Sequence, residues 1–419
     1  MVEPAIHRTV EAVWRMESAK IIAKLTRMLR QVGIAEEFAQ DALVTALEQW
    51  PRTGVPDNPA AWLMTTAKNR ALDELRRRKL VNRTHEAIAN ATPTAMPDRE
   101  HALDDDVGDD LLRLIFIACH PVLSTDARTA LTLRMLAGLK TEEIARAFLV
   151  SEPAIAQRIV RAKRTLAEAQ VPFELPSAEE RAKRLGSVLE VIYLIFNEGY
   201  AATSGEDWTR PALCEEAMRL GRILAELLPV EPEVHGLVSL MEIQASRLGA
   251  RVDAAGEPVL LLAQNRGQWN QLLVRRGLAA LDRAQRLGGP SGPYTLQAAI
   301  AACHARAATA AATDWEQIVA LYDALAQVTP SPVVELNRAV AVSMAFGPAA
   351  ALQLVDTLSQ EPRLTHYHLL PSVRGDLLQK LGRYDDARVE FSRAAGLTQN
   401  ARERTLLLGR AAACGMQAQ

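Results

Sequence analysis

An internal repeat in the C-terminal part of the chain limits the folds open to it. Three largely apolar triplets share one helical spacing and lie 33 and 36 residues apart: Ile318, Tyr322, Leu325; Ala351, Val355, Leu358; and Ala387, Phe391, Ala394. A period of about 34 residues is that of tetratricopeptide helix pairs. A weaker copy starts at Ala280, Ala284 and Leu287. Because stacked helix pairs leave a concave surface, we expect this part to hold a peptide or another domain.

Composition extends the helical expectation to the whole chain. Aromatic residues make up only 5% of the 419 residues, whereas Ala, Leu, Glu and Arg are abundant. Such a sequence favours helices over strands, so the predicted fold class is all-α. With 49% hydrophobic residues the chain can bury several cores, and its length suggests roughly two to four domains.

Charge and cysteine content exclude several classes of protein. The net charge is −2, so contact with DNA must come from local basic patches. The four cysteines are dispersed without a CxxC pair, which argues against a zinc ribbon, a redox dithiol and a disulfide framework. No signal peptide or membrane-spanning run is predicted, and we expect a reduced, cytoplasmic setting.

The first basic patch lies in WLMTTAKNRALDELRRRK, residues 62–79. Asn58 and Pro59 predict a capped helix start just before it. The face expected to meet a core carries Leu63, Ala67, Leu72 and Leu75. Another stripe at helical spacing carries Trp62, Thr66, Asn69, Asp73 and Arg76. The basic cluster at residues 76–79 also suits the negative end of a helix dipole, so a solvated helix end is the plainer alternative.

The second basic patch lies in LKTEEIARAFLVSEPAIAQRIVRAKRTL, residues 139–166. Thr141 and Ser151 are each predicted to cap a short helix, with a turn over residues 149–151. Two helices joined in this way form a helix-turn-helix, whose second helix enters the major groove of DNA. Arginines on the outer face of the second helix favour this function over a purely structural helix pair.

These segments suggest domain boundaries. We predict a first domain at 1–80, with helices broken at Gly33 and at residues 51–59, followed by a linker at 81–108 that ends in an acidic run. A second domain is predicted at 109–172, a helical extension at 177–290 and the repeats at 291–415.

Together, these pieces resemble the extracytoplasmic-function group (group IV) of sigma-70 family RNA polymerase sigma factors, specifically members with a long, tetratricopeptide-like C-terminal extension. AEEFAQDALVTALEQW, residues 35–50, resembles region 2.2, residues 62–79 resemble regions 2.3 and 2.4, and residues 139–166 resemble region 4.2. The resemblance implies a subunit that binds core RNA polymerase, recognises −35 and −10 promoter elements, helps to open the DNA and performs no covalent chemistry.

The resemblance also implies which residues make each contact. Docking on the clamp helices of the largest polymerase subunit is implied for a region that includes Glu36, Glu37, Gln40 and Asp41. The resemblance also implies a contact with the polymerase flap, without assigning residues to it. Reading and opening of the −10 element is implied for Trp62, Thr66, Lys68, Asn69, Arg70, Asp73, Arg76 and Arg77. Reading of the −35 element is implied for Ser151, Ala154, Gln157, Arg158, Arg161, Lys163 and Arg164.

Several of these assignments have a plainer alternative. Trp62 suits stacking on an unpaired base, which contributes about 1 to 3 kcal/mol per base, but a core tryptophan at a helix start has the same sequence. An acidic pair such as Glu36 and Glu37 in a first helical turn is also ordinary capping chemistry. Exposed polar residues on the second helix of the helix-turn-helix are also consistent with simple solvation.

Two segments of the extension resemble patterns of the same subgroup. IYLIFNEGYAATSG, residues 192–205, looks like its shared signature. QNRGQWN, residues 264–270, resembles a more acidic pattern, with Asn265 and Asn270 in place of aspartates, which leaves the pairing of that pattern in doubt. Five residues of these segments are candidates for contact with a ligand or with another domain: Asn197, Glu198, Tyr200, Arg266 and Trp269. A buried polar network that holds helices together is the alternative.

We expect the extension to act in place of a separate anti-sigma protein, by contacting the DNA-binding domains of its own chain. Two other functions compete with the sigma-factor interpretation. A helix-turn-helix regulator with a repeat sensor domain would have no reason to carry residues 35–79. An enzyme is the weaker alternative, since the histidines lack metal-ligand spacing and no phosphate-cradling loop or activated nucleophile is recognisable. No metal, cofactor or catalytic residue is therefore predicted.

Overall fold

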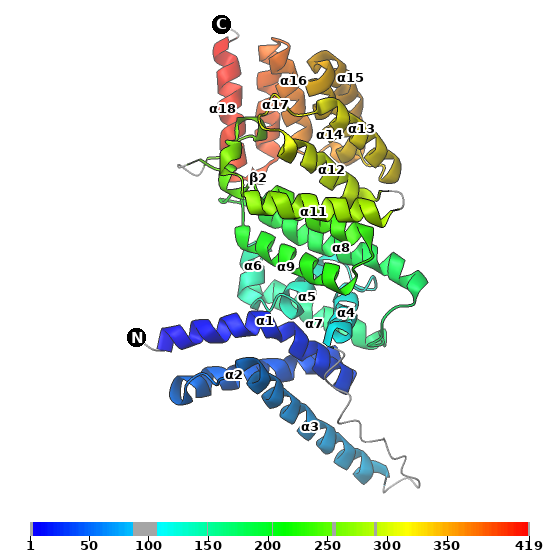
Figure 1. Cartoon of the computed structure of the whole chain (residues 1–419). Helices are drawn as coiled ribbons and strands as arrows, with labels where there is room; N and C mark the ends of the chain where they lie inside the picture. Colours follow the sequence, from blue (N-terminus) through cyan, green and yellow to red (C-terminus); the bar gives the residue numbers. More distant parts are fainter. Residues whose placement is uncertain are drawn as a thin grey trace. The chain divides into compact units, whose positions relative to one another are not determined.

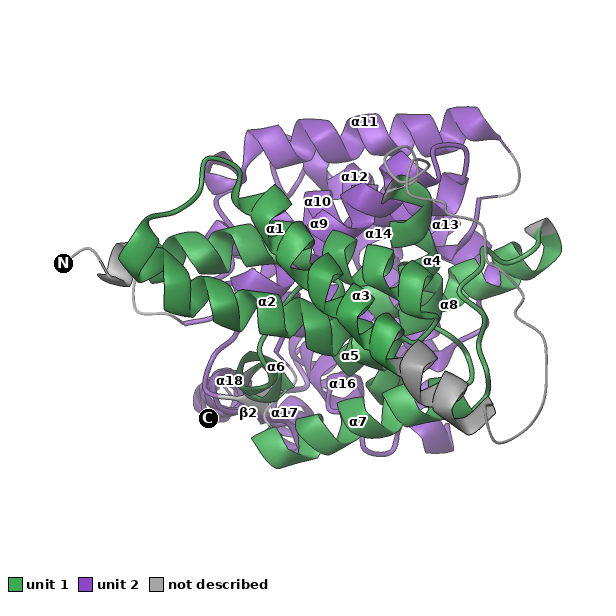
Figure 2. Ribbon diagram, turned by 90° about the horizontal axis from the view of Figure 1, so that it is seen from below, with its two compact units in different colours: residues 1–192 green, residues 193–419 purple. Residues whose placement is uncertain are grey.

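The computed structural model describes residues 3–86, 107–148, 150–202, 204–253, 257–288 and 291–417. Within these residues the chain is helical apart from one pair of two-residue strands (Figure 1). It divides into two compact units, residues 1–192 and 193–419, which are coloured separately in Figure 2. The boundary falls inside helix α8 (Ala178–Tyr200). The predicted all-α class is confirmed.

The first unit begins with α1 (Glu3–Leu29), α2 (Val32–Thr53) and α3 (Pro59–Glu86), and α1 packs on both of the others. The break after α1 falls at Arg30, whose φ of 56° is left-handed, and Gly33 lies in the first turn of α2. The predicted break at Gly33 is therefore wrong. Asn58 caps α3 as predicted, because its side chain accepts a hydrogen bond from the backbone nitrogen of Ala61 at 3.0 Å.

The buried face of α3 differs in part from the prediction. Leu63 and Ala67 are buried as expected, but the next buried residue is Ala71, and Leu72 is only half-buried. The side chain of Leu75 lies outside the described residues. The helix continues to Glu86, past the expected start of the linker at residue 81, and residues 87–106 of that linker also lie outside the described part.

The rest of the first unit contains α4 (Val107–Ala118), α5 (Thr125–Met135), α6 (Thr141–Phe148), α7 (Glu152–Glu168) and the first part of α8. Helices α6 and α7 pack on each other, which confirms the predicted helix-turn-helix. The buried apolar side chains of these two helices are Ile144, Ala145, Ile155, Ile159 and Leu166.

The helix starts of this motif differ in detail from the prediction. Helix α6 begins at Thr141 itself, and the carboxylate of Glu143 accepts a hydrogen bond from the backbone nitrogen of Lys140 at 2.7 Å. Ser151 is the N-cap residue of α7, but its side chain makes no capping bond. Instead, its carbonyl oxygen accepts from the backbone nitrogens of Ala154 and Ile155 at 3.0 and 3.2 Å. The predicted turn residue Leu149 lies outside the described residues.

The second unit is first organised around α10 (Pro232–Ala245), which packs on α9 (Pro211–Leu227), α11 (Gln271–Leu287) and α12 (Pro293–Arg306). A Cβ added at Gly236 in α10 would lie 2.7 Å from the backbone nitrogen of Thr295 in α12, so only glycine permits this approach. Short 3-10 turns connect α10 to α11: η1 (Leu248–Ala250), η2 (Leu261–Ala263) and η3 (Arg266–Gln268).

The predicted repeats form consecutive helix pairs: α13 (Trp315–Val328) with α14 (Pro332–Phe346), α15 (Pro348–Leu358) with α16 (Leu369–Lys380), and α17 (Tyr384–Leu397) with α18 (Ala401–Gln417). The turn η4 (Pro362–Leu364) precedes α16. Each triplet lies on the first helix of a pair, and its buried members are Ile318, Leu325, Ala351, Val355, Ala387, Phe391 and Ala394. Each helix packs on the next along the chain, giving a tetratricopeptide-like solenoid (Figure 1).

The weaker fourth copy of the repeat does not coincide with the buried face of its helix. In α11 the buried face contains Val274, Gly277, Leu281 and Ala284, whereas Leu287 is 37% exposed.

A pair of short strands joins the beginning and the end of the second unit. The strands β1 (Ser204–Gly205) and β2 (Gln399–Asn400) pair in parallel.

Candidate nucleic-acid and polymerase interfaces

Helix α3 presents most of the predicted −10 residues to solvent. The exposed members are Asn69, Arg70, Asp73, Arg76 and Arg77, and the half-buried ones are Thr66 and Lys68. Trp62 is half-buried and packs edge-on against the buried Trp50, with ring centroids 5.4 Å apart. Trp62 therefore contacts the core while its side chain is only partly covered, and its stacking on an unpaired base stays a prediction.

Ion pairs orient the arginines of this stripe. Arg70 reaches from α3 to α2, where it contacts Asp41 at 2.8 Å and the hydroxyl of Thr45 at 2.8 Å. Asp73 pairs with Arg76 at 3.1 Å. Exposed pairs of this kind contribute at most about 1 kcal/mol, so the guanidinium groups can exchange these partners for phosphates at little cost.

Helix α7 forms one wall of a hollow of about 440 Å³ whose other wall is the start of α5. Four predicted −35 residues line it, namely Ala154, Gln157, Arg158 and Arg161. Arg158 contacts Asp126 of α5 at 3.3 Å, and Arg161 donates to the side-chain oxygen of Gln157 at 3.3 Å. Ser151 and Arg164 are also exposed, and Arg164 pairs with Glu168 at 2.6 Å. These side chains form a continuous polar surface.

Lys163 does not share that surface, although it was predicted to contact the −35 element. Its side chain is 20% exposed and its ammonium group pairs with Glu36 of α2. Arg134 of α5 donates to the same carboxylate at 2.8 Å, and Gln40 also donates to it. Burial lowers the pKa of both Lys163 and Arg134. Desolvation therefore outweighs the effect of the carboxylate on these two cations.

Glu36 is thus inaccessible in this arrangement, which corrects its predicted position on an exposed docking surface. The residue is 2% exposed. Of the other predicted docking residues, Glu37 and Asp41 are exposed and Gln40 is half-buried. The carboxylate of Glu36 is covered by the side chains of Arg134 from α5 and Lys163 from α7, contacts that no local pattern in the sequence signals.

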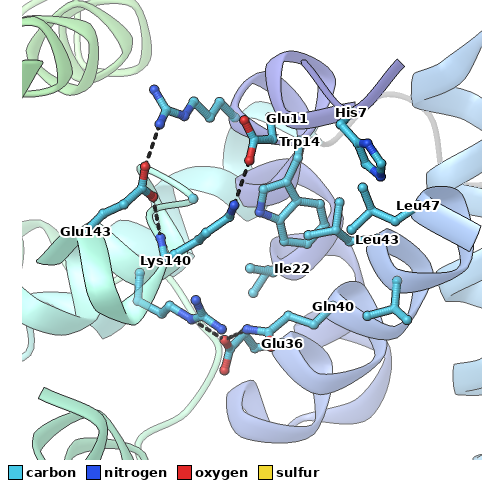
Figure 3. A pocket seen from close by; sticks show the side chains of 14 residues that line it. His7, Glu11, Trp14, Ile22, Glu36, Gln40, Leu43, Leu47, Lys140 and Glu143 are labelled. Carbon is cyan, nitrogen blue, oxygen red and sulfur yellow. Dashed lines mark hydrogen bonds and ion pairs between the residues drawn. The ribbon is translucent and has the colours of Figure 1, made fainter. Parts of the chain in front are cut away.

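Further ion pairs surround a cavity of about 390 Å³ next to Glu36 (Figure 3). Lys140 pairs with Glu11 at 2.6 Å, and Arg15 pairs with Glu143 at 2.8 Å. The bond to Lys140 lowers the pKa of Glu11. The apolar lining comes from α1 and α2 and consists of Trp14, Ile22, Leu43, Val44 and Leu47.

Gly138 allows the close approach that shapes this cavity. Its φ is 66°, and an added Cβ would stand 2.8 Å from the hydroxyl of Ser18 in α1. The cavity is therefore bounded by a tight contact between α1 and the segment joining α5 to α6.

In the second unit the contact candidates make separate polar and aromatic contacts, and of the five only Glu198 and Trp269 are buried. Glu198 is buried and pairs with Arg210. Asn197 is half-buried. Arg266 donates to the backbone oxygens of His304 and Ala307 at the end of α12 and to the hydroxyl of Thr313 at 3.0 Å. These bonds tie η3 to the end of α12.

The two asparagines of the 264–270 segment have a definite local role. Asn265 accepts from the backbone nitrogen of Gly267 at 3.0 Å and so caps η3. Asn270 accepts from the backbone nitrogens of Leu272 and Leu273 at 3.0 and 3.2 Å and so caps α11. Aspartate and asparagine are nearly equal as helix caps, so the capping role does not depend on the acid.

Two further arginines of this region contact the predicted residues without any signal in the sequence. The Cζ atom of Arg247 lies 5.7 Å from the ring centroids of both Tyr200 and buried Trp269, and that of Arg251 lies 3.9 Å from the Tyr200 ring. Neither belongs to a recognisable motif. Only the packing of η1 near the end of α8 brings them to the predicted contact residues.

His304 should make the second unit sensitive to acid. It is 8% exposed, and burial lowers its pKa from 6.5 to about 4, with Arg247 and Arg266 acting in the same direction. The neutral ring therefore stabilises the folded state above pH 6.5, and this contribution is lost as the pH falls to 4. At 1.36 kcal/mol per pKa unit, the loss in the free energy of unfolding is about 3 kcal/mol.

Urea unfolding of the full chain at a series of pH values measures this effect. His304→Phe keeps an aromatic ring against Trp315, whose ring centroid lies 5.1 Å away, but cannot titrate. This variant is expected to lose most of the acid sensitivity between pH 6.5 and 4, whereas His366→Phe, at an exposed position, should retain it. Equal acid sensitivity in His304→Phe and the unaltered chain would contradict the prediction.

Within the described residues, no group of three or more His, Cys, Asp or Glu side chains is arranged to hold a metal ion. Among the described helices, none has both the length and the apolar content that a bilayer-crossing segment needs.

Both segments that are predicted to bind DNA match known protein families. Residues 14–81 match sigma-70 region 2, and residues 113–166 match sigma-70 region 4. Residues 184–285 match a family of unknown function, DUF6596. The sigma-factor family is not an enzyme family, and region 2 and region 4 domains imply binding of core RNA polymerase and promoter DNA.

Individual relatives agree with these matches. The chain is 47% identical to the uncharacterized protein R00370 of Rhizobium meliloti (strain 1021) over 90% of this chain and 89% of that protein. It is 25% identical to the probable ECF RNA polymerase sigma factor SigI of Mycobacterium tuberculosis, over 42% of this chain and 60% of SigI. It is also 29% identical to the ECF RNA polymerase sigma factor SigK of Mycobacterium sp. (strain KMS), over 30% of this chain and 65% of SigK.

Among solved structures, yeast Tom70 matches over 99% of this chain with 12% identity and a TM-score of 0.33, which is too low to bear on function or fold. The two sigma-70 matches cover the segments that contain the exposed faces of α3 and α7. The chain belongs to the extracytoplasmic-function group of sigma-70 family sigma factors, among the members with a C-terminal helical extension.

Proposed function

We propose that this chain directs core RNA polymerase to promoters by reading the −35 element with α7 and by reading and opening the −10 element with α3. The observation that carries this proposal is the presence of two exposed polar faces in one unit. One lies on α7 beside the start of α5, and the other lies on α3 beside a half-exposed tryptophan.

The side chains of α3 suit the opening of a promoter. Flipping a base out of the stack costs a few kcal/mol, and stacking on an aromatic ring recovers about 1 to 3 kcal/mol per base. Trp62 is the half-buried aromatic residue proposed to stack on a base, and the exposed amide of Asn69 has both a donor and an acceptor for a base edge. Arg70, Arg76 and Arg77 suit phosphates, which position the strand without reading its sequence.

Helix α2 is the proposed docking element for polymerase, and Glu37 and Asp41 are the predicted docking acids that it exposes. Glu36 would take part only after the first unit opens, because Arg134 and Lys163 now occupy its carboxylate. We therefore propose that the described arrangement is a closed resting state. With a net charge of −2, the free chain should also bind DNA weakly until polymerase presents it to a promoter.

Runoff transcription with sigma-free core polymerase tests the proposal. Purified protein should give a transcript that starts at a defined promoter and depends on both promoter elements. A helix-turn-helix regulator that does not replace another sigma factor would bind DNA without polymerase and would give no such transcript. The match to sigma-70 region 2 at residues 14–81 supports the sigma-factor reading, since a plain regulator has no use for it.

The extension is proposed to regulate the same activity in cis, and truncation tests this. Part of α8 stabilises the first unit, since Ser187 donates to the backbone oxygen of Cys119 at 2.9 Å and Glu190 pairs with Arg128 at 3.3 Å. A chain ending at residue 200 keeps these contacts, whereas one ending at residue 176 loses them. Transcript yield from the longer truncation is expected to differ several-fold from that of the full chain. Equal yields would argue against regulation by the extension.

A further inference from the structure

Three arginines of the second unit surround one aromatic cluster without an acidic partner. The Cζ atoms of Arg247 and Arg266 lie 5.7 and 5.1 Å from the ring centroid of Trp269, and that of Arg251 lies 3.9 Å from the centroid of Tyr200. Among the described residues, the ion pairs within 4.0 Å include none of these three guanidinium groups. The cluster therefore concentrates positive charge.

Neighbouring arginines of the same unit show how unusual this is. Arg210 pairs with the buried Glu198, and Arg222 and Arg276 contact the buried Glu242 at 2.8 and 3.5 Å. Buried charges are normally compensated in this way, because an unpaired charge taken out of water is costly.

Two of the three arginines also have unused hydrogen-bond donors. Arg247 is 7% exposed, its Nε atom has no partner, and its side-chain partners are the neutral oxygens of Gln244 and Tyr200. The Nε atom of Arg251 is likewise buried without a partner. Because buried polar groups are normally hydrogen-bonded, these two donors leave room for an acceptor that the described residues do not supply.

Arg266 contributes to the positive charge of the cluster but has fewer free hydrogen-bond donors than the other two arginines. The donors of Arg266 are occupied by backbone oxygens and a hydroxyl, so Arg266 adds charge but offers fewer free donors. Burial lowers the pKa of Arg247, and nearby Arg251 acts in the same direction. An anion at this position would relieve both the repulsion between the guanidinium groups and the lack of acceptors.

We propose that Arg247 and Arg251, beside Tyr200, bind an oxyanion: a phosphate or carboxylate group of a small ligand. The planar, five-donor guanidinium group matches both kinds of oxyanion in a bidentate geometry. Arg251 is half-buried, so it connects the fully buried Arg247 to solvent. This inference concerns the second unit alone and does not depend on how the first unit engages polymerase or DNA.

Thermal unfolding of the full chain tests the site with inorganic phosphate as the probe. Because a ligand that binds only the folded state stabilises it by mass action, the unfolding midpoint should rise by a few degrees as phosphate increases. Sodium chloride at the same ionic strength should not produce this rise. Acetate in a parallel series distinguishes a carboxylate site from a phosphate site. An equal shift in chloride would overturn the proposal.

Variants localise the effect. Arg251→Gln should abolish the response to phosphate, whereas Arg286→Gln, at an exposed position in α11, should preserve it. Retention of the full response in Arg251→Gln would overturn the proposal.

Two isosteric variants keep the test decisive if Arg251→Gln fails to fold. The backbone nitrogen of Asn270 donates to Ser246, next to Arg247, at 2.8 Å, and Asn265 adjoins Arg266. Asn265→Asp and Asn270→Asp retain the two caps and supply a carboxylate from within the chain. The double variant should unfold at a higher temperature without phosphate and should respond less to it. An unchanged phosphate response would contradict the site.

Discussion

Replacing both Arg158 and Arg161 with alanine is expected to lower promoter-specific transcription by about 30-fold or more. An arginine that makes two hydrogen bonds to a guanine contributes about 1 to 3 kcal/mol of discrimination against other bases. A difference of about 1.4 kcal/mol corresponds to a factor of ten in an equilibrium constant. Both side chains line the hollow beside α5, and their present partners, Asp126 and Gln157, are exposed. These partners can be exchanged for base edges without breaking a buried contact.

Runoff transcription with saturating core polymerase measures this loss, and unfolding curves should show that the variant remains folded. Arg286→Ala is the matched control, because it removes an exposed arginine from the second unit. A promoter with an altered −35 element should already be transcribed poorly and should lose little more in the double variant. If both promoters lost activity equally, the two arginines would serve as general phosphate contacts, contrary to the prediction.

Glu36→Ala is expected to lower the free energy of unfolding of the first unit by about 3 kcal/mol. Removing one partner of a buried ion pair leaves the other charge uncompensated, which costs about 3 to 5 kcal/mol. Glu36 is 2% exposed and faces two cations whose side chains are each 20% exposed. The lower end of the range applies because Arg134 and Lys163 are partly accessible to water.

Combined substitutions test whether these three charged residues form one coupled cluster. Replacing Glu36, Arg134 and Lys163 together with methionine should cost less than the sum of the single changes, because no charge is left unpaired. Additive effects in urea unfolding would contradict a coupled cluster.

The same residues test the proposed closed state through polymerase binding. Arg134→Met with Lys163→Met should free α2 and strengthen association with core polymerase several-fold, although the protein becomes less stable. Glu37→Ala, at an exposed position, should weaken association with little change in stability. Weaker polymerase binding by the Arg134 and Lys163 double variant would argue against a closed state held by this cluster.

Local features of the sequence predicted the helices and their order well. The helix-turn-helix at residues 139–166, the cap at Asn58 and the three repeat triplets all follow from apolar spacing and capping chemistry over a few residues. Errors arose where neighbouring residues compete for one role. The chain turns at Arg30 rather than at Gly33, and Ala71 rather than Leu72 faces the core.

The all-helical class, the order of the segments and the solenoid can therefore be inferred from local residue patterns, because helical periodicity is set by residues three and four positions apart. The partners of the charged side chains are set by the packing of distant segments and cannot be inferred in this way. Glu36 meets Arg134 and Lys163 from 98 and 127 positions away, and the Arg247 cluster assembles from α8, η1 and η3. Such contacts depend on packing between distant helices, and a charged residue has the same local pattern whether it is buried by a partner or exposed to DNA.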